Sequence, residues 1–234
     1  MKLHVHATEE IMRLVILDID GTLTDTTQVD EHAIVGALQD VLGVSGLSTD
    51  WSDYEHSTDA GIVYEVIAHN AGSVPASLLG RVQDRFFEYM ENFYTSSPDL
   101  FSALPGATRI LKQLQDNGYA VAIATGSWRE SALFKLRVAG VWHDDVPMAT
   151  ADDHVSRSSI IRKAADDARK QHNVTTFDEI IYVGDGTWDA RASKNLGIRF
   201  IGVAKNGNSD ALRKFGVETI CKDLTEVTDL LLPK

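Results

Sequence analysis

Short apolar runs rich in β-branched residues recur along the chain, and helical patterns separate them. The runs are residues 13–20 (RLVILDID), 119–124 (YAVAIA), 180–183 (IIYV) and 198–203 (IRFIGV), with a weaker one at 217–221. Runs of this length, bounded by turn residues, are typical of strands buried on both faces. The helical patterns are residues 106–117, 130–138, 158–171 and 188–195. This alternation predicts βα units, and therefore an α/β fold with a parallel sheet between layers of helices.

The alternation stops between about residues 26 and 98. That segment carries apolar helical periodicity at residues 32–42, 61–70 and 76–93, without a convincing strand pattern. We therefore expect a mainly helical cap, residues 26–98, inserted into a Rossmann-like core of residues 1–25 and 99–234. Open α/β sheets bind ligands at the carboxyl ends of their strands, so an insertion directly after the first strand would cover the site.

The charge balance limits the partners of the chain. It carries 34 acidic residues against 22 lysines and arginines, a net charge of −12, which disfavours binding along a nucleic-acid backbone. No apolar run approaches the roughly 18 residues that a membrane span needs, and the first residues, MKLHVHATEE, lack the apolar middle of a secretory signal. We expect a cytoplasmic protein that binds neither nucleic acid nor membrane, as a monomer or a homodimer.

Two pairs of aspartates follow predicted strands. Asp18 and Asp20 end the first run, directly before Gly21, and alternate residues of a strand point the same way. Asp185 and Asp189 come directly after a later run. Buried like charges need a cation or a shared proton. The four carboxylates therefore predict a divalent-metal site with oxygen ligands, of the kind that Mg²⁺ prefers.

A third strand end carries groups suited to phosphate. Thr125, Gly126 and Ser127 follow the second run and precede a helical pattern. A hydroxyl and backbone N–H groups at such a point can cradle a phosphate group. The cation opposite the transferred phosphoryl group is expected to be Arg157, at the start of the next helical pattern, with Lys163 as the alternative.

Taken together, these segments resemble the haloacid dehalogenase superfamily of phosphohydrolases. DIDGTLTD at residues 18–25 looks like the first signature of that family, and Thr125-Gly126-Ser127 resembles the second. Arg157 matches the basic residue of the third, and GDGTWD at residues 184–189 resembles the fourth. The helical insertion lies where the C1-type cap lies in phosphoglycolate phosphatase-like and β-phosphoglucomutase-like members.

The resemblance implies a role for each aspartate. Asp18 would attack phosphorus and become an aspartyl phosphate. Asp20 would protonate the leaving oxygen and then activate water. Mg²⁺ would be bound by Asp18, by the backbone carbonyl of Asp20 and by Asp185, with Asp189 as a supporting ligand.

The resemblance also implies how the phosphoryl group is held. Thr125, the N–H of Gly126 and Ser127 would bind the phosphoryl oxygens, while Arg157 would offset the developing charge and orient Asp18.

In the predicted cap, the polar stretch HSTDAG opens a helical pattern. Thr58 or Asp59 could simply cap that helix. The same two residues could instead contact the leaving group of a substrate, and the sequence leaves both interpretations open.

The sequence thus predicts a Mg²⁺-dependent phosphatase that hydrolyses a small phosphorylated metabolite through an aspartyl-phosphate intermediate. A phosphomutase of the β-phosphoglucomutase type shares these motifs and remains an alternative, as does a non-catalytic binding protein on the same fold. A phosphonatase that uses a cap lysine is disfavoured, because residues 26–98 contain no lysine.

Overall fold

The computed structural model describes residues 12–72, 75–204 and 209–232. Residues 1–11, which were assessed above for a secretory signal, lie outside this range. Within the described residues, six strands form one sheet in the order β3-β2-β1-β4-β5-β6, and every neighbouring pair is parallel. The strands are β1 (Arg13–Leu17), β2 (Ala120–Ala124), β3 (Met148–Ala149), β4 (Glu179–Gly184), β5 (Arg199–Val203) and β6 (Ile220–Cys221). This sheet confirms the predicted α/β fold with a Rossmann-like core.

Strand β1 lies in the middle of the sheet because its side chains are apolar on both faces. Leu14, Val15, Ile16 and Leu17 are fully buried. Val15 and Leu17 belong to one apolar core, while Leu14 and Ile16 belong to a second core on the opposite face. A strand with this pattern needs helices on both sides.

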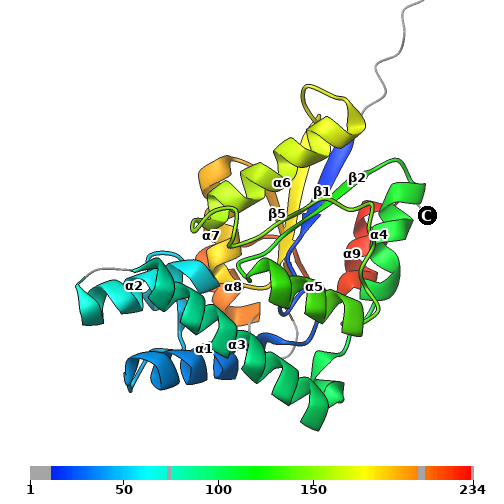
Figure 1. Ribbon diagram of the computed structural model, residues 1–234. Coiled ribbons are helices and arrows are strands. Elements are labelled where there is room, and N and C mark those ends of the chain that lie inside the picture. The colour runs from blue at the N-terminus through cyan, green and yellow to red at the C-terminus, as the bar shows by residue number, and fades with distance from the viewer. Residues whose placement is uncertain (1–11, 73–74, 205–208, 233–234) are drawn as a thin grey trace, which may run out of the picture.

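Helices cover both faces of the sheet (Figure 1). Those that contribute to the core of Val15 and Leu17 are α4 (Ala107–Asp116), α5 (Arg129–Val138) and α9 (Leu224–Leu231). Those that contribute to the core of Leu14 and Ile16 are α6 (Arg157–His172) and α7 (Thr187–Leu196). Helix α8 (Ser209–Phe215) follows β5. No helix in the described part of the chain is long and apolar enough to cross a membrane.

Three further helices, α1 (Thr27–Leu42), α2 (Asp59–Ala71) and α3 (Ala76–Ser96), form the helical insertion after β1. They lie together to one side of the sheet and its helices (Figure 1). They share their own apolar core, which includes Ile34, Ile67 and Phe86. Trp128, which follows β2, joins this core and packs edge-on against Phe86 with ring centroids 5.1 Å apart. The insertion therefore packs on the loop at the carboxyl end of β2.

Short single-turn elements complete the connections. They are the 3₁₀ helices Trp51–Asp53 and Pro98–Phe101, on either side of α2 and α3. The predicted boundaries of the cap, at residues 25/26 and 98/99, remain a prediction.

The first strand is shorter than its apolar run suggests. β1 ends at Leu17, and the carbonyl of Ile19 accepts hydrogen bonds from the N–H groups of Leu23 and Thr24. The chain turns sharply at Gly21, whose φ is 74°. Asp18 and Asp20 therefore stand on the loop that leaves the strand, and only Asp18 continues the sheet, through its N–H to Val183.

Candidate active site

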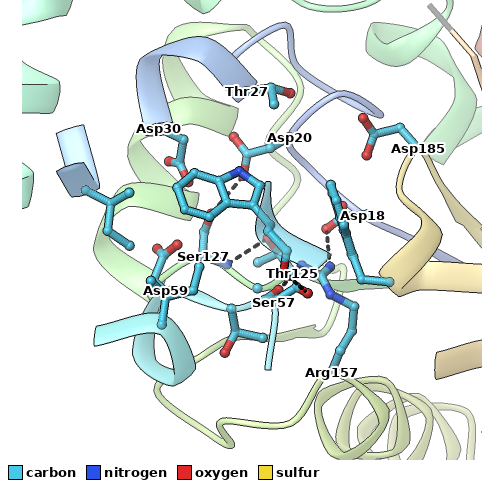
Figure 2. A pocket seen from close by; sticks show the side chains of 16 residues that line it. Asp18, Asp20, Thr27, Asp30, Ser57, Asp59, Thr125, Ser127, Arg157 and Asp185 are labelled. Carbon is cyan, nitrogen blue, oxygen red and sulfur yellow. Dashed lines mark hydrogen bonds and ion pairs between the residues drawn. The ribbon is translucent and has the colours of Figure 1, made fainter. Parts of the chain in front are cut away.

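The loops at the carboxyl ends of β1, β2 and β4 meet the helical insertion at a pocket (Figure 2). Its empty space, which includes the opening to solvent, is about 530 Å³. From the core, the lining residues are Asp18, Asp20, Thr125, Gly126, Ser127, Arg157, Asp185 and Trp188. From the insertion, they are Thr27, Asp30, Ile34, Trp51, Ser57, Thr58, Asp59 and Ile62. Every predicted site residue lines the pocket except Asp189, which contacts Arg157 behind the lining.

Asp18 lines the pocket and is only 3% exposed. One of its carboxylate oxygens is 3.3 Å from Nη1 of Arg157. Burial raises the pKa of Asp18 to about 8, and the neighbouring carboxylate of Asp189 adds to the rise while Arg157 opposes it. This carboxyl group therefore needs more positive charge than Arg157 alone supplies.

Three carboxylates are close enough to share one cation. Asp18, Asp185 and Asp189 each offer an oxygen atom, and these atoms all lie within 4.8 Å of one another. Burial, followed by the charges of Asp189 and Asp18, raises the pKa of Asp185. Asp185 also explains Gly21, since a Cβ atom there would lie 2.1 Å from its Oδ2.

Asp189 is completely buried at the start of α7 and is held from several sides. Its Oδ2 accepts a hydrogen bond from the N–H of Gly186 at 3.0 Å. Its Oδ1 accepts one from the hydroxyl of Tyr182 at 3.2 Å and lies 3.0 Å from Nη1 of Arg157. Both oxygens therefore have partners, and Asp189 holds Arg157 in place.

Arg157 is the cation that reaches the pocket. It begins α6, where the hydroxyl of Ser156 caps the helix by accepting from Ser159 N–H. Its Nη2 donates to the carbonyl of Ser57 in the insertion at 2.8 Å. Lys163, the alternative cation, pairs with Asp167 one turn along α6 and does not line the pocket.

Thr125, Gly126 and Ser127 form a tight turn after β2. The Thr125 hydroxyl accepts the N–H of Ser127 at 3.1 Å, so it organises the turn itself. Gly126 allows Arg157 to approach, because a Cβ atom there would lie 2.3 Å from Nη2 of Arg157. The Ser127 hydroxyl donates to Asp20 at 2.7 Å and is thus tied to the acid/base candidate.

Asp20 is held by Lys135, a residue that the sequence reasoning did not identify. Lys135 lies on α5 and is 0% exposed. Its Nζ is 2.7 Å from both carboxylate oxygens of Asp20, from Oδ1 of Asp30 and from the Ser127 hydroxyl. The Thr26 hydroxyl donates to Asp20 as well, at 2.6 Å.

These contacts determine the charge states of Asp20 and Lys135. Burial alone would raise the pKa of Asp20, but Lys135 and the hydrogen bonds from Thr26 and Ser127 outweigh it and lower the pKa. Burial also disfavours the charged form of Lys135, yet the carboxylates of Asp20 and Asp30 raise its pKa. Asp20 and Lys135 therefore form a buried ion pair.

Thr58 and Asp59 connect the insertion to the core as well as lining the pocket. The Thr58 hydroxyl caps α2 by accepting the N–H of Gly61 at 3.1 Å, and it donates to the carbonyl of Val155 at 2.7 Å. Asp59 donates its N–H to the carbonyl of Gly126 at 2.8 Å, and its Oδ2 accepts the N–H of Trp128 at 2.9 Å. The capping interpretation is correct for Thr58, while the contact with a substrate remains a prediction for both residues.

Comparison with known proteins agrees with this geometry. Residues 15–203 match the family model described as haloacid dehalogenase-like hydrolase. A phosphoglycolate phosphatase from Cereibacter sphaeroides is 23% identical over 189 residues, which cover 80% of this chain and 82% of the relative. A protein named "Probable phosphatase IndB" from Dickeya dadantii is 27% identical over 227 residues, 92% and 91% of the two chains.

The fold has solved counterparts too. A hydrolase from Pseudomonas syringae superimposes with a TM-score of 0.72 and 21% identity, covering 94% of this chain and 99% of the other. Because the family model spans most of the sequence, this protein belongs to the haloacid dehalogenase-like hydrolases.

Proposed function

We propose that this protein is a Mg²⁺-dependent phosphatase that hydrolyses a small phosphomonoester through an aspartyl phosphate on Asp18. One observation carries the proposal: the buried Asp18 carboxylate faces the pocket between Arg157 and the carboxylates of Asp185 and Asp189. In that arrangement Arg157 supplies positive charge on one side of the nucleophile, and a cation held by the carboxylates would supply it on the other, as transfer of a phosphoryl group requires. Curated relatives that are phosphatases support the reaction class.

The donor set fits Mg²⁺. Carboxylate oxygens are the hard ligands that this ion prefers, and those of Asp18, Asp185 and Asp189 lie within 4.8 Å of one another. Asp18, Asp185 and the backbone carbonyl of Asp20 would hold the ion, with Asp189 in support. When bound, Mg²⁺ would neutralise charge on the phosphoryl oxygens and help to align the ester.

In the first step, a carboxylate oxygen of Asp18 attacks phosphorus, and the bond from phosphorus to the leaving alcohol breaks. Thr125, Gly126 and Ser127 hold the phosphoryl oxygens, and Arg157 offsets their charge. Because the contacts with Lys135 favour the ionised form of Asp20, Asp20 must first take up a proton from solvent, and it then gives that proton to the leaving oxygen.

In the second step, the Asp20 carboxylate takes a proton from water, and the water oxygen attacks phosphorus. The bond between phosphorus and Asp18 breaks, which releases inorganic phosphate and restores the nucleophile. The ionised, hydrogen-bonded state of Asp20 supports this role as a base.

The insertion, residues 26–98, serves as a cap in this proposal. Its contacts with the core include those of Ser57, Thr58 and Asp59, which meet Arg157, Val155 and Gly126. A cap held by these contacts would keep bulk water from the pocket during the first step. The relatives named as phosphatases support a small phosphorylated metabolite as the substrate.

Asp18→Asn tests the nucleophile. Asparagine keeps the shape of the side chain but does not attack phosphorus, so turnover of an aryl phosphate in Mg²⁺ should fall by about 10³-fold or more. The control is Asp40→Asn, which removes the same charge from an exposed position on α1 and should leave turnover unchanged. Retained activity in Asp18→Asn would refute the assignment.

Assays of the same kind distinguish a phosphatase from the alternative, a phosphomutase. A phosphatase releases inorganic phosphate from the ester alone, whereas a phosphomutase isomerises a sugar phosphate and needs a bisphosphate primer. Release of phosphate without a primer is the result that we expect.

A further inference from the structure

The pocket has two chemically different sides. Figure 2 shows Asp185 and Arg157 on one side and Asp30 and Asp59 on the other. We call the second the insertion side. Besides the two aspartates, the insertion contributes the apolar side chains Ile34, Trp51 and Ile62 and the polar residues Thr27, Ser57 and Thr58 to the lining. If the phosphoryl group lies against Asp18, as proposed above, the leaving group must extend toward the insertion side.

The insertion side offers negative charge but little positive charge. Asp30 and Asp59 both belong to it, and Asp20 lies next to it. The cation nearest to them, Lys135, is 0% exposed and already lies 2.7 Å from Asp20 and Asp30. Its charge is therefore used within the protein and is not presented to a ligand.

Within the described residues, Arg157 is the one basic side chain that lines the pocket. It lies on the phosphoryl side, where it pairs with Asp18 and Asp189. It is therefore not available to a charged group at the far end of the substrate.

The sequence of the insertion itself provides few cations. Residues 26–98 contain no lysine and two arginines, Arg81 and Arg85. Both lie on α3 and neither lines the pocket. Arg85 pairs with Asp40 and Glu88 on the surface.

This lining belongs to the docked state of the insertion. Arg157 Nη2 bonds the carbonyl of Ser57 at 2.8 Å, and the N–H of Asp59 bonds the carbonyl of Gly126 at 2.8 Å. The side chains that line the insertion side in this docked state are therefore those that would surround the leaving group during the reaction.

We infer that the substrate is the phosphomonoester of an uncharged or cationic alcohol, with no carboxylate or second phosphate on its leaving group. A hydroxyl or amino group would donate to Asp59, and a carbon skeleton would pack on Trp51, Ile34 and Ile62. A carboxylate would instead lie beside carboxylates with no cation in the described lining free to pair with it, which is unfavourable in a partly buried site. The inference rests on the proposed phosphatase activity and separates this chain from relatives named for phosphoglycolate. The leaving group of that ester, glycolate, carries a carboxylate.

Three esters of nearly equal size test it: 2-phosphoglycolate, 2-hydroxyethyl phosphate and O-phosphoethanolamine, whose leaving groups are anionic, neutral and cationic. We expect kcat/KM for phosphoglycolate to be about 10-fold to 100-fold lower than for the other two, the range expected from one or two like charges nearby. Equal or better turnover of phosphoglycolate would overturn the inference. Mg²⁺-dependent turnover of an aryl phosphate that Asp18→Asn abolishes would still support the phosphatase, so the two failures are distinguishable.

A cation added to the lining of the pocket should change the preference between the anionic and the neutral leaving group. Thr27 is the first residue of α1, is half-buried and lines the pocket. Thr27→Lys should raise the phosphoglycolate/hydroxyethyl phosphate ratio of kcat/KM by about 10-fold. Gln28→Lys is the matched control, because it adds the same charge at the next, exposed position, which does not line this pocket. If Thr27→Lys and Gln28→Lys change this ratio of kcat/KM equally, the result would count against the inference, because the overall charge of the protein would then explain the change.

Removing a carboxylate should act in the complementary way. Asp59→Asn should lower the preference for phosphoethanolamine over hydroxyethyl phosphate by several-fold. Glu91→Gln, at an exposed position on α3, should leave it unchanged. An unchanged preference in Asp59→Asn would exclude Asp59 as the contact for the leaving group and would overturn that part of the inference.

Discussion

At the residue scale, Lys135 ties together parts of the site that are far apart in sequence. Its ammonium group joins Asp20 on the loop after β1, Asp30 on α1 and Ser127 after β2, each at 2.7 Å. It therefore connects the acid/base candidate with the first helix of the insertion. A lysine that is 0% exposed is tolerated only because these acceptors surround its charge.

Lys135→Met should destabilise the fold. The substitution leaves the buried carboxyl groups of Asp20 and Asp30 without their cation, and removal of one partner of a buried pair costs about 3–5 kcal/mol. Urea denaturation measures the loss. Lys112→Met is the control, because Lys112 is exposed and pairs with Asp116 within one helix; such pairs contribute at most about 0.5 kcal/mol. A loss for Lys135→Met no larger than that of the control would contradict the buried pair.

The motif residues could be predicted from the sequence, whereas Lys135 could not. Asp18 and Asp20 are readable because they directly follow an apolar run, and Arg157 because it opens a helical pattern. Lys135 lies on the buried face of α5, between Ala132 and Leu136. That position indicates a buried ion pair, because a lysine on an apolar helix face needs an acceptor for its charge. Its partner Asp30 is 105 residues away in sequence, so only the packing of the insertion could identify the pair.

At the scale of elements, the start of α2 combines a helix cap with a contact between insertion and core. Thr58 caps the helix, and Asp59, its first residue, accepts the N–H of Trp128. Burial raises the pKa of Asp59 well above its ordinary value, and the nearby carboxylate of Asp30 raises it further, while Lys135 opposes the rise. The folded protein therefore holds a proton on Asp59 more tightly than the unfolded chain does.

Asp59→Asn should change how stability depends on pH. Folding raises the pKa of Asp59. The protonated side chain therefore contributes to the stability of the folded protein below about pH 4, and this contribution is lost as pH rises through the folded pKa. The amide cannot ionise, so Asp59→Asn should gain stability relative to wild type as pH increases from 4 to 8. Chemical denaturation at several pH values measures this difference.

Asp40→Asn provides a control of opposite sign. Hydrogen bonds from Arg85 and Tyr89 lower the pKa of Asp40, so its contribution is present above the unfolded pKa and is lost as pH falls. The control should therefore be slightly less stable than wild type at pH 8 and equal to it at low pH. If the difference in unfolding free energy between wild type and Asp59→Asn does not vary with pH, this result would contradict the raised pKa of Asp59.

The elements with strong periodicity were predicted, and the short or polar ones were not. The four strong apolar runs overlap β1, β2, β4 and β5, and the helical patterns overlap α1 to α7. β3, with two residues, and the short helices α8 and α9 give too little periodicity to be recognised. α1 begins at Thr27, five residues before the predicted pattern, because its polar first turn hides its start.

At the scale of the whole molecule, the fold concentrates negative charge at one end of the sheet. The chain has a net charge of −12, and Asp18, Asp20, Asp185 and Asp189 come together from the ends of β1 and β4. Such a site accepts a phosphate ester only with a cation in place. The proposed metal site thus explains how an acidic protein can bind an anionic substrate.

Mg²⁺ should therefore stabilise the folded protein. Binding to the folded state alone contributes about 2.7 kcal/mol at a concentration 100 times the dissociation constant, which thermal unfolding in a Mg²⁺ titration would detect. Asp185→Asn should abolish the Mg²⁺-dependent part of the shift, whatever its effect on the apo protein. Asp40→Asn should keep it. The same Mg²⁺ response in Asp185→Asn as in wild type would exclude Asp185 from the site.

The claim that Asp18 becomes phosphorylated can be measured directly. Turnover of an aryl phosphate in Mg²⁺, quenched and reduced with borohydride, converts an aspartyl phosphate into homoserine, which peptide mass spectrometry locates in the sequence. We predict homoserine at position 18 in the wild-type protein, and none in enzyme reduced without substrate. Homoserine at any other aspartate, or active enzyme that never yields it at position 18, would contradict the account.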